Sequence, residues 1–116
     1  MSEFAFLFRG GNPSVAPAEQ QQRTMQKWQA WMKELHDKGM ITNPGHPLER
    51  KGHLVSGRSK IVNDSPFVEV KDIINGFIVI DAADLDEAVQ ISKGCPILDV
   101  DGAVEVRPVR QFNPQG

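Results

Sequence analysis

Residues 76–88 read GFIVIDAADLDEA, and this stretch indicates how the chain folds. The run from Gly76 to Asp81 predicts a strand that is apolar on both faces, because successive side chains of a strand point to opposite sides. Asp84 lies three residues before Glu87, an Asp variant of the capping box that begins a helix. Gly94 is the expected end of that helix. Its inner face is predicted to carry Leu85, Ala88, Val89 and Ser92.

The N-terminal third predicts a second strand and a long helix. Residues Glu3–Arg9 alternate so that apolar side chains fall on both faces of a strand. A helix is expected from Pro17 to Gly39, because proline suits the first helical position and glycine the residue after the last. The apolar residues at helical spacing are Met25, Trp28, Trp31, Met32 and Leu35. The simplest interpretation is that they pack in the core; the alternative is that Trp28 and Met32 line an apolar pocket.

The middle of the chain predicts shorter elements. A short strand is expected over Met40–Thr42, and residues 43–47, which read NPGHP, are expected to interrupt regular structure. A hairpin is predicted with arms at His53–Ser56 and Ser59–Asn63, turning at Gly57-Arg58. The last expected strand covers Val104–Val109.

The order of these elements is strand, helix, strand pair, strand, helix, strand. That order predicts an α+β sandwich of ferredoxin-like type with an antiparallel sheet. Two helices can cover one face of such a sheet, yet two of its strands are apolar on both faces. We therefore expect a symmetric homodimer in which two sheets pack face to face, unless an extra segment of the same chain covers the second face.

Composition narrows the class of protein. The chain has 116 residues, the length of one domain, and carries 13 Lys and Arg against 15 Asp and Glu, a net charge of −2. This balance argues against nucleic-acid binding, which usually needs a basic domain. The single cysteine, Cys95, excludes an internal disulfide, and the apolar run Phe4–Phe8 is too short for a signal peptide or a membrane span. We expect a soluble cytoplasmic protein that binds neither nucleic acid nor membrane.

Asp64 is the leading candidate for a catalytic residue. It precedes Pro66 and Phe67 in a predicted turn over residues 63–67. One interpretation is structural, because Asp side chains in turns accept hydrogen bonds from backbone N–H groups. The other is functional: a carboxylate at the mouth of a pocket, positioned by a stiff turn, acts as general acid or base.

Three further candidates are weaker. His46, Glu49 and His53 have a spacing that superficially suggests a metal site, but the prolines around His46 oppose the helix that would align them, so no metal ion and no cofactor is predicted. Cys95 is expected to be a small buried side chain because no catalytic partner lies beside it. Gly10-Gly11, with the preceding arginine, could receive an anion, but a plain loop is favoured because no phosphate-loop lysine follows.

Several short motifs together resemble one known family. They are Val62-Asn63-Asp64-Ser65-Pro66-Phe67, Ile74-Asn75-Gly76-Phe77-Ile78-Val79-Ile80-Asp81, Asp84-Leu85-Asp86-Glu87-Ala88, Cys95-Pro96 and Val104-Glu105-Val106-Arg107-Pro108-Val109. The chain resembles the YCII-related family, in the branch often called DGPF-domain proteins. The resemblance covers nearly the whole chain and is weakest between Thr42 and Lys60.

This resemblance implies one YCII-related domain over residues 1–110, followed by a tail at residues 111–116. It also implies a dimeric α/β barrel built from two ferredoxin-like subunits, with a cleft near the dimer centre into which the Asp64 turn projects. Some relatives carry a His–Asp pair proposed as an active site, and one relative is a dehydrochlorinase that acts on a chlorinated aromatic.

Two positions depart from the family pattern. Ser65 stands where the family has glycine, and serine adopts positive φ less readily, so the turn is expected to differ. Residues 16–19 read APAE at the helix start, where the relatives with a His–Asp pair carry histidine. His46 could replace that histidine if its loop folds back toward Asp64.

Two functions are therefore compatible with the sequence. The first is a homodimer that binds a small aromatic or carboxylate ligand in a pocket, with Asp64 as the acid or base of an enzyme. The pocket residues predicted for it are Phe67, Trp28, Met32 and His46. The second is a non-catalytic regulatory or protein-interaction module, whose partner docks on the basic hairpin or on the acidic last third of the chain.

Overall fold

Four antiparallel strands form the main sheet, in the spatial order β2-β5-β1-β6. In the computed structural model, the described residues are 2–11, 17–64 and 69–111. The strands of the sheet are β1 (Ser2–Gly10), β2 (Ile41–Pro47), β5 (Ile74–Ala82) and β6 (Gly102–Pro108). The expected α+β arrangement and its antiparallel sheet are confirmed, because β1 and β5 at the centre are both antiparallel to their neighbours.

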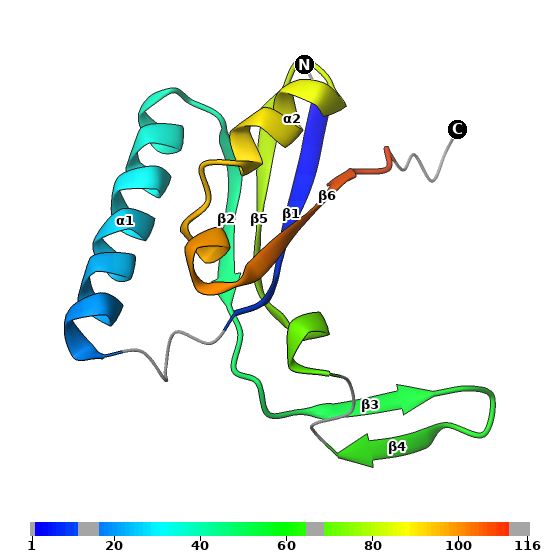
Figure 1. Ribbon diagram of the computed structural model, residues 1–116. Coiled ribbons are helices and arrows are strands. Elements are labelled where there is room, and N and C mark those ends of the chain that lie inside the picture. Colours follow the sequence, from blue (N-terminus) through cyan, green and yellow to red (C-terminus); the bar gives the residue numbers. More distant parts are fainter. Residues whose placement is uncertain (1, 12–16, 65–68, 112–116) are drawn as a thin grey trace.

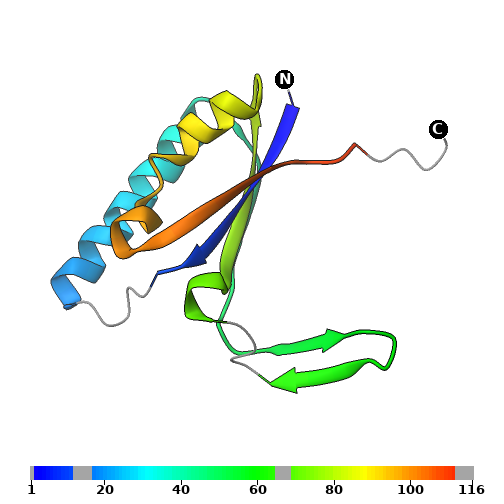
Figure 2. The same ribbon diagram turned by 45° about the vertical axis from the view of Figure 1, so that its right-hand side comes forward.

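Two helices lie on the same side of this sheet, α1 (Ala18–Asp37) and α2 (Leu85–Ser92) (Figures 1 and 2). Two 3-10 turns complete the described elements, η2 (Val70–Asp72) and η3 (Pro96–Val100). The core lies between the helices and one face of the sheet. Its buried side chains are Phe4, Phe6, Phe8, Trp31, Leu35, Ile78, Ile80, Ala82, Ala88, Cys95 and Ile97. Among the described helices, none has the length and hydropathy needed to cross a bilayer.

Local signals set the helix ends as predicted. Pro17 directly precedes α1, and Gly39 follows it with φ +69°, a value that suits glycine. The Asp84 carboxylate accepts a hydrogen bond from the backbone N–H of Glu87 at 2.8 Å, which satisfies one of the unpaired donors at the start of α2. Two residues predicted to pack in the core are exposed instead: Met25 by 62% and Leu85 by 44%, because each lies before the first buried residue of its helix.

Strand β2 is longer than the sequence predicts. Residues 43–47 were expected to interrupt regular structure, but they continue the pairing of β2 with β5 through two register shifts. Gly45 makes this possible: it has φ +61°, and a Cβ atom there would lie 1.6 Å from the carbonyl oxygen of Phe77. A glycine at this irregularity therefore allows the backbone of β2 to lie directly against β5.

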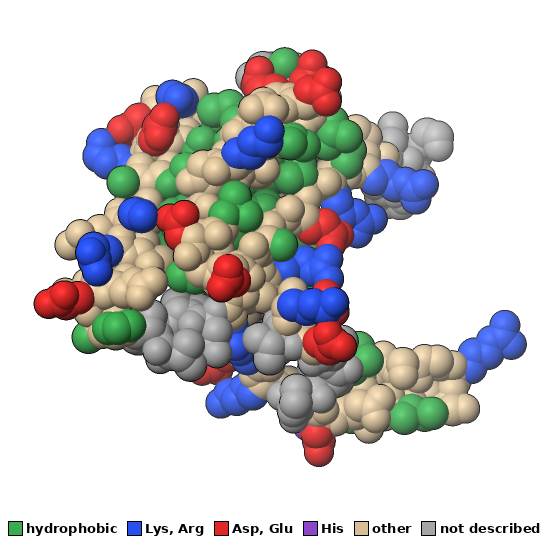
Figure 3. All heavy atoms as spheres, viewed as in Figure 1, with side chains coloured by type: hydrophobic (Ala, Val, Ile, Leu, Met, Phe, Trp, Pro, Cys, Tyr) green, Lys and Arg blue, Asp and Glu red, His purple; other side chains and the backbone are tan. Residues whose placement is uncertain are grey.

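A two-stranded hairpin, β3 (His53–Ser56) with β4 (Ile61–Asp64), projects from the body as an arm. Figure 3 shows a deep notch between this arm and the rest of the molecule. The radius of gyration is 16.0 Å, against about 13 Å for a compact domain of this length. The turn covers four residues instead of two, because the N–H of Lys60 donates to the carbonyl of Gly57 at 3.1 Å.

The second face of the sheet is not covered by any described segment. The arm projects outward on the side of the sheet away from both helices (Figure 2). The side chains of Ala5, Leu7 and Val79, from β1 and β5, are half-buried here. We call them the open face; it is the second apolar face that the alternation of both strands predicts.

Candidate functional site

A cavity of about 750 Å³ lies beside the middle of α1, where Thr24, Trp28 and Met32 line it. Its volume is in the range of small-molecule sites in proteins. Trp31 and Leu35 are the buried residues of α1, so the described part of the helix before Trp31 buries no side chain. The cavity wall includes Phe8, Thr24, Trp28, Met32, Ile78, Ile97 and Val100 on the helix side, and Pro44, His46, Pro47, Leu48, Glu49, Arg50, Asn75 and Phe77 toward the end of the sheet.

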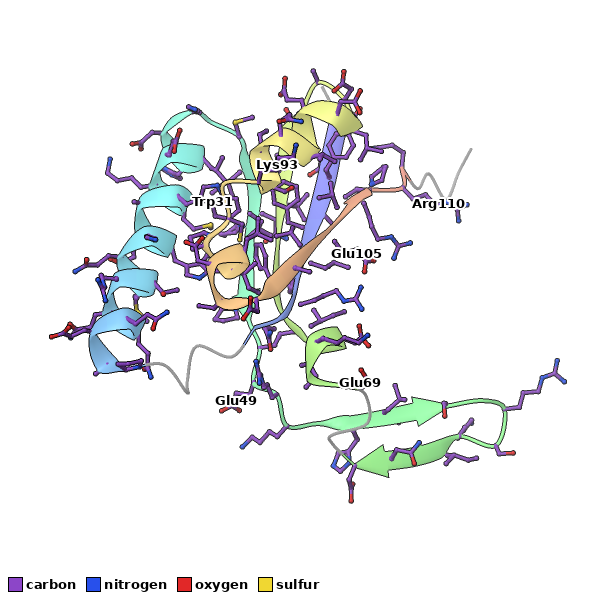
Figure 4. All side chains as sticks on the ribbon, in the orientation of Figure 1. Trp31, Glu49, Glu69, Lys93, Glu105 and Arg110 are labelled. Atoms are coloured by element: carbon purple, nitrogen blue, oxygen red, sulfur yellow. The ribbon has the colours of Figure 1, made fainter. Side chains whose placement is uncertain are left out.

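Aromatic rings make up much of the helix-side wall. Trp28 meets Phe8 edge-on, with ring centroids 5.0 Å apart, and meets Trp31 edge-on at 5.8 Å. Trp31 is buried between α1 and the sheet, where Figure 4 labels it, and it stacks on Phe6. Trp28 and Met32 are half-buried, so parts of both side chains face the cavity. This wall offers an aromatic, polarisable surface to a ligand.

A small hydrogen-bonded network forms the polar end of the cavity. The guanidinium of Arg50 donates through Nη2 to the carbonyl of Gly11 and lies 3.4 Å, through Nε, from Oδ1 of Asn75. The side-chain amide of Asn75 donates to the carbonyl of Gly10 at 2.5 Å. Arg50 is therefore held in place from two sides at the point where the chain leaves β2, next to Glu49, which Figure 4 labels.

Three of the predicted pocket residues, Trp28, Met32 and His46, line this same cavity. The ring of His46 also meets that of Phe77 edge-on, with centroids 6.5 Å apart. Phe67, the fourth, lies outside the described residues.

Asp64 lies elsewhere. It was expected in a turn, but it is the last residue of β4, at the base of the arm, and it is not part of the cavity wall. Its Oδ1 lies 2.7 Å from Nδ1 of His53, directly across the hairpin. Both side chains are exposed, and with Lys51 and Gly52 they line a second, shallower hollow. The sequence did not predict this His–Asp pair, and His46 does not contribute to it.

The other candidates have structural surroundings. Burial raises the pKa of the Cys95 thiol from 9.0 to about 12, so the thiol is protonated at neutral pH and is a poor nucleophile. Arg9 does not present an open cation beside Gly10-Gly11: it pairs with Asp72 at 2.7 Å and with Glu105 at 2.9 Å. Within the described ranges, no three His, Cys, Asp or Glu side chains are grouped in a way that could hold a metal ion.

Similarity to known proteins identifies the class to which this chain belongs. The model of the YCII-related domain matches residues 4–113, so the chain belongs to the YCII-related family. One relative is an uncharacterized protein, R00369, of Rhizobium meliloti (strain 1021), 38% identical over 60 residues. That match covers 51% of this chain and 48% of the relative, so the chain spans about half the length of that protein.

A solved structure shows the same fold. It is 5-chloro-2-hydroxyhydroquinone dehydrochlorinase (TftG) from Burkholderia phenoliruptrix AC1100, in complex with 2,5-dihydroxybenzoquinone. The two chains superpose with a TM-score of 0.53 over 95% of each chain, at 16% sequence identity. The similarity supports the ferredoxin-like arrangement of the main sheet and its helices.

Proposed function

We propose that this protein binds a small aromatic ligand in the cavity under α1. The observation that carries the proposal is the wall itself: Trp28, Phe8 and Met32 border a space of about 750 Å³ that is large enough for a compound of one or two rings. Binding to such a wall is favourable because a flat apolar ring displaces water from it. The cyclic ligand in the structure of TftG is consistent with this class of ligand.

Blocking the cavity tests this proposal. A panel of one- and two-ring aromatic compounds, neutral and acidic, is screened by thermal stabilisation and calorimetry. Met32→Trp places a larger side chain in the cavity wall, and we expect it to abolish the binding of any compound that stabilises the wild type. Met25→Trp makes the same change on the same helix at a position that is 62% exposed, and it should leave binding unchanged. Equal loss of binding in both variants, or no compound that binds the wild type, would contradict the proposal.

A second candidate function, acid–base catalysis, is favoured by the contact between His53 and Asp64. A carboxylate that holds Nδ1–H of a histidine leaves the other ring nitrogen, Nε2, able to take a proton from a bound molecule. In this proposal His53 is the base, and Asp64 orients it. The sequence predicts Asp64 itself as the acid or base, whereas in this proposal the base is His53.

The state of the His53 ring tests this second candidate. In the wild type, ¹⁵N chemical shifts should show the neutral ring protonated on Nδ1, and Asp64→Asn should abolish that preference. In a turnover assay, Asp64→Asn should reduce kcat while the protein stays folded. A ring protonated mainly on Nε2 in the wild type would overturn the assignment.

The open face and the arm support a homodimer. Leu7 and Val79 lie on an apolar surface with no cover from the described residues, and the arm itself exposes Val55 and Val62 to solvent. An isolated two-stranded hairpin is marginally stable in water, so an arm of this composition gains stability by packing on another surface. A second copy seated on the open face would cover both.

Light scattering coupled to gel filtration tests the dimer. The wild type should elute with twice the mass of the 12.9 kDa chain, and Leu7→Lys combined with Val79→Lys should elute as the monomer. Lys33→Glu, on the outer surface of α1, is the control and should not change the mass. A monomeric wild type would contradict this part of the proposal.

A further inference from the structure

Arg50 and Arg9 differ in the charge of the groups that hold them. Arg9 is neutralised by two carboxylates, at 2.7 and 2.9 Å. Arg50 is half-buried and its hydrogen bonds within the described residues go to neutral oxygens, those of Gly11 and Asn75. No described carboxylate forms an ion pair with it. The acidic residue beside it, Glu49, lies 3.7 Å from the ammonium of Lys51 and is largely exposed.

A half-buried guanidinium with neutral partners has an unmatched positive charge. Removing a charge from water costs free energy, and an opposite charge compensates for that cost better than a neutral acceptor does. Arg50 lines the cavity, so the space where such a charge would sit is the cavity itself. The two hydrogen bonds also fix the plane of the guanidinium, which reduces the entropy lost when a planar anion binds to it.

From this arrangement we infer that the ligand of the cavity is an aromatic carboxylate. Its ring packs against Trp28 and Met32, and its carboxylate accepts hydrogen bonds from Arg50, while Asn75 acts as a positioning residue through its contact with the guanidinium. This inference rests on the proposed binding of an aromatic ligand, and it adds the charge that the ligand must carry. A ring with a neutral polar group would fill the apolar wall but leave Arg50 unmatched.

A matched pair of probes separates the ring from the charge. The probes are 2-naphthoate and its neutral counterpart 2-naphthamide, and binding is measured by titration calorimetry at low salt. For the wild type we expect 2-naphthoate to bind about 10- to 100-fold more tightly than 2-naphthamide, the usual gain from hydrogen bonds to a charged group. Arg50→Met should lower the affinity for 2-naphthoate by a similar factor and leave that for 2-naphthamide within about twofold.

Two further variants guard against an effect on folding. Arg50→Lys keeps the charge but loses the planar fork, so it should retain part of the preference for 2-naphthoate. Lys33→Met removes an exposed cation on the outer surface of α1, which is not part of the cavity wall, and should leave both affinities unchanged.

The outcomes distinguish this inference from the function on which it rests. Equal affinity of the wild type for both probes, or a preference for 2-naphthoate that survives in Arg50→Met, would overturn the assignment of the carboxylate while the aromatic cavity stands. Binding of neither probe, together with no hit from the wider aromatic panel, would overturn both.

Discussion

Two tryptophans on one helix allow stability and ligand binding to be separated. Trp28 and Trp31 are three residues apart on α1 and in ring contact, at 5.8 Å. Trp31 is 7% exposed and is not part of the cavity wall, whereas Trp28 is half-buried and borders the cavity. Substitutions can therefore be chosen that cost similar free energies of unfolding but have different effects on binding.

The expected free energies follow from burial. A fully buried Phe or Trp replaced by alanine costs about 3–5 kcal/mol, so Trp28→Ala, at half burial and with loss of the edge-on contact to Phe8, should cost about 2 kcal/mol. Trp31→Phe removes part of a buried ring and should cost a similar amount, about 2 kcal/mol. For a chain of 116 residues, each variant should then lower Tm by about 8 °C.

Binding should respond differently in the two variants. We expect Trp28→Ala to weaken the binding of 2-naphthoate about tenfold, because the ring of the ligand loses an aromatic partner, and Trp31→Phe to change it by less than about twofold. Circular dichroism melting curves measure the first quantity and calorimetry the second, on the same samples. The account of the cavity is refuted if both variants weaken binding equally, or if Trp31→Phe weakens it more.

Three predictions concern the rest of the chain. Cys95 should resist iodoacetamide in the native protein and react once urea unfolds it, because burial raises the pKa of its thiol to about 12. The stability contributed by the buried, protonated thiol is complete below pH 9.0 and declines as pH rises toward 12. The Cys95→Ala variant should lack this decline. Asp84→Ala should lower the free energy of unfolding by about 1 kcal/mol, read from urea melts, through loss of the cap on Glu87. Gly45→Ala should destabilise the protein by more than Gly39→Ala, since a Cβ at position 45 meets the backbone of Phe77 and a Cβ at position 39 meets nothing within 4 Å; equal melting temperatures would contradict this.

The elements that were predicted well are those whose signals are local. Alternation over Gly76–Asp81 and Glu3–Arg9 requires no knowledge of neighbours, and neither does the cap at Asp84. The NPGHP stretch was misread because proline and glycine usually end a strand, whereas here the pairing with β5 carries the strand past both. That pairing is a tertiary interaction, which residues 43–47 alone do not encode.

The residues around the cavity and the arm also separate into those with a local sequence signal and those without one. Trp28 and Met32 were predicted from helical spacing, which places them on one side of α1. Arg50 and Asn75 were missed because the partners of Arg50 lie 39 and 25 residues away in the chain. The His53–Asp64 pair was missed for a geometric reason: a two-residue turn would place Asp64 beyond the arm, and the observed four-residue turn places it opposite His53.

The most direct test of the central claim is a map of where the ligand binds. Two-dimensional ¹H–¹⁵N spectra recorded during titration with 2-naphthoate report the binding position without any substitution. We expect shifts at the indole N–H of Trp28 and at the amides of Gly10, Asn75 and Gly76, with the arm amide of Val55 unchanged. Shifts confined to the arm or the open face, with the signals around the cavity unmoved at saturation, would contradict this claim.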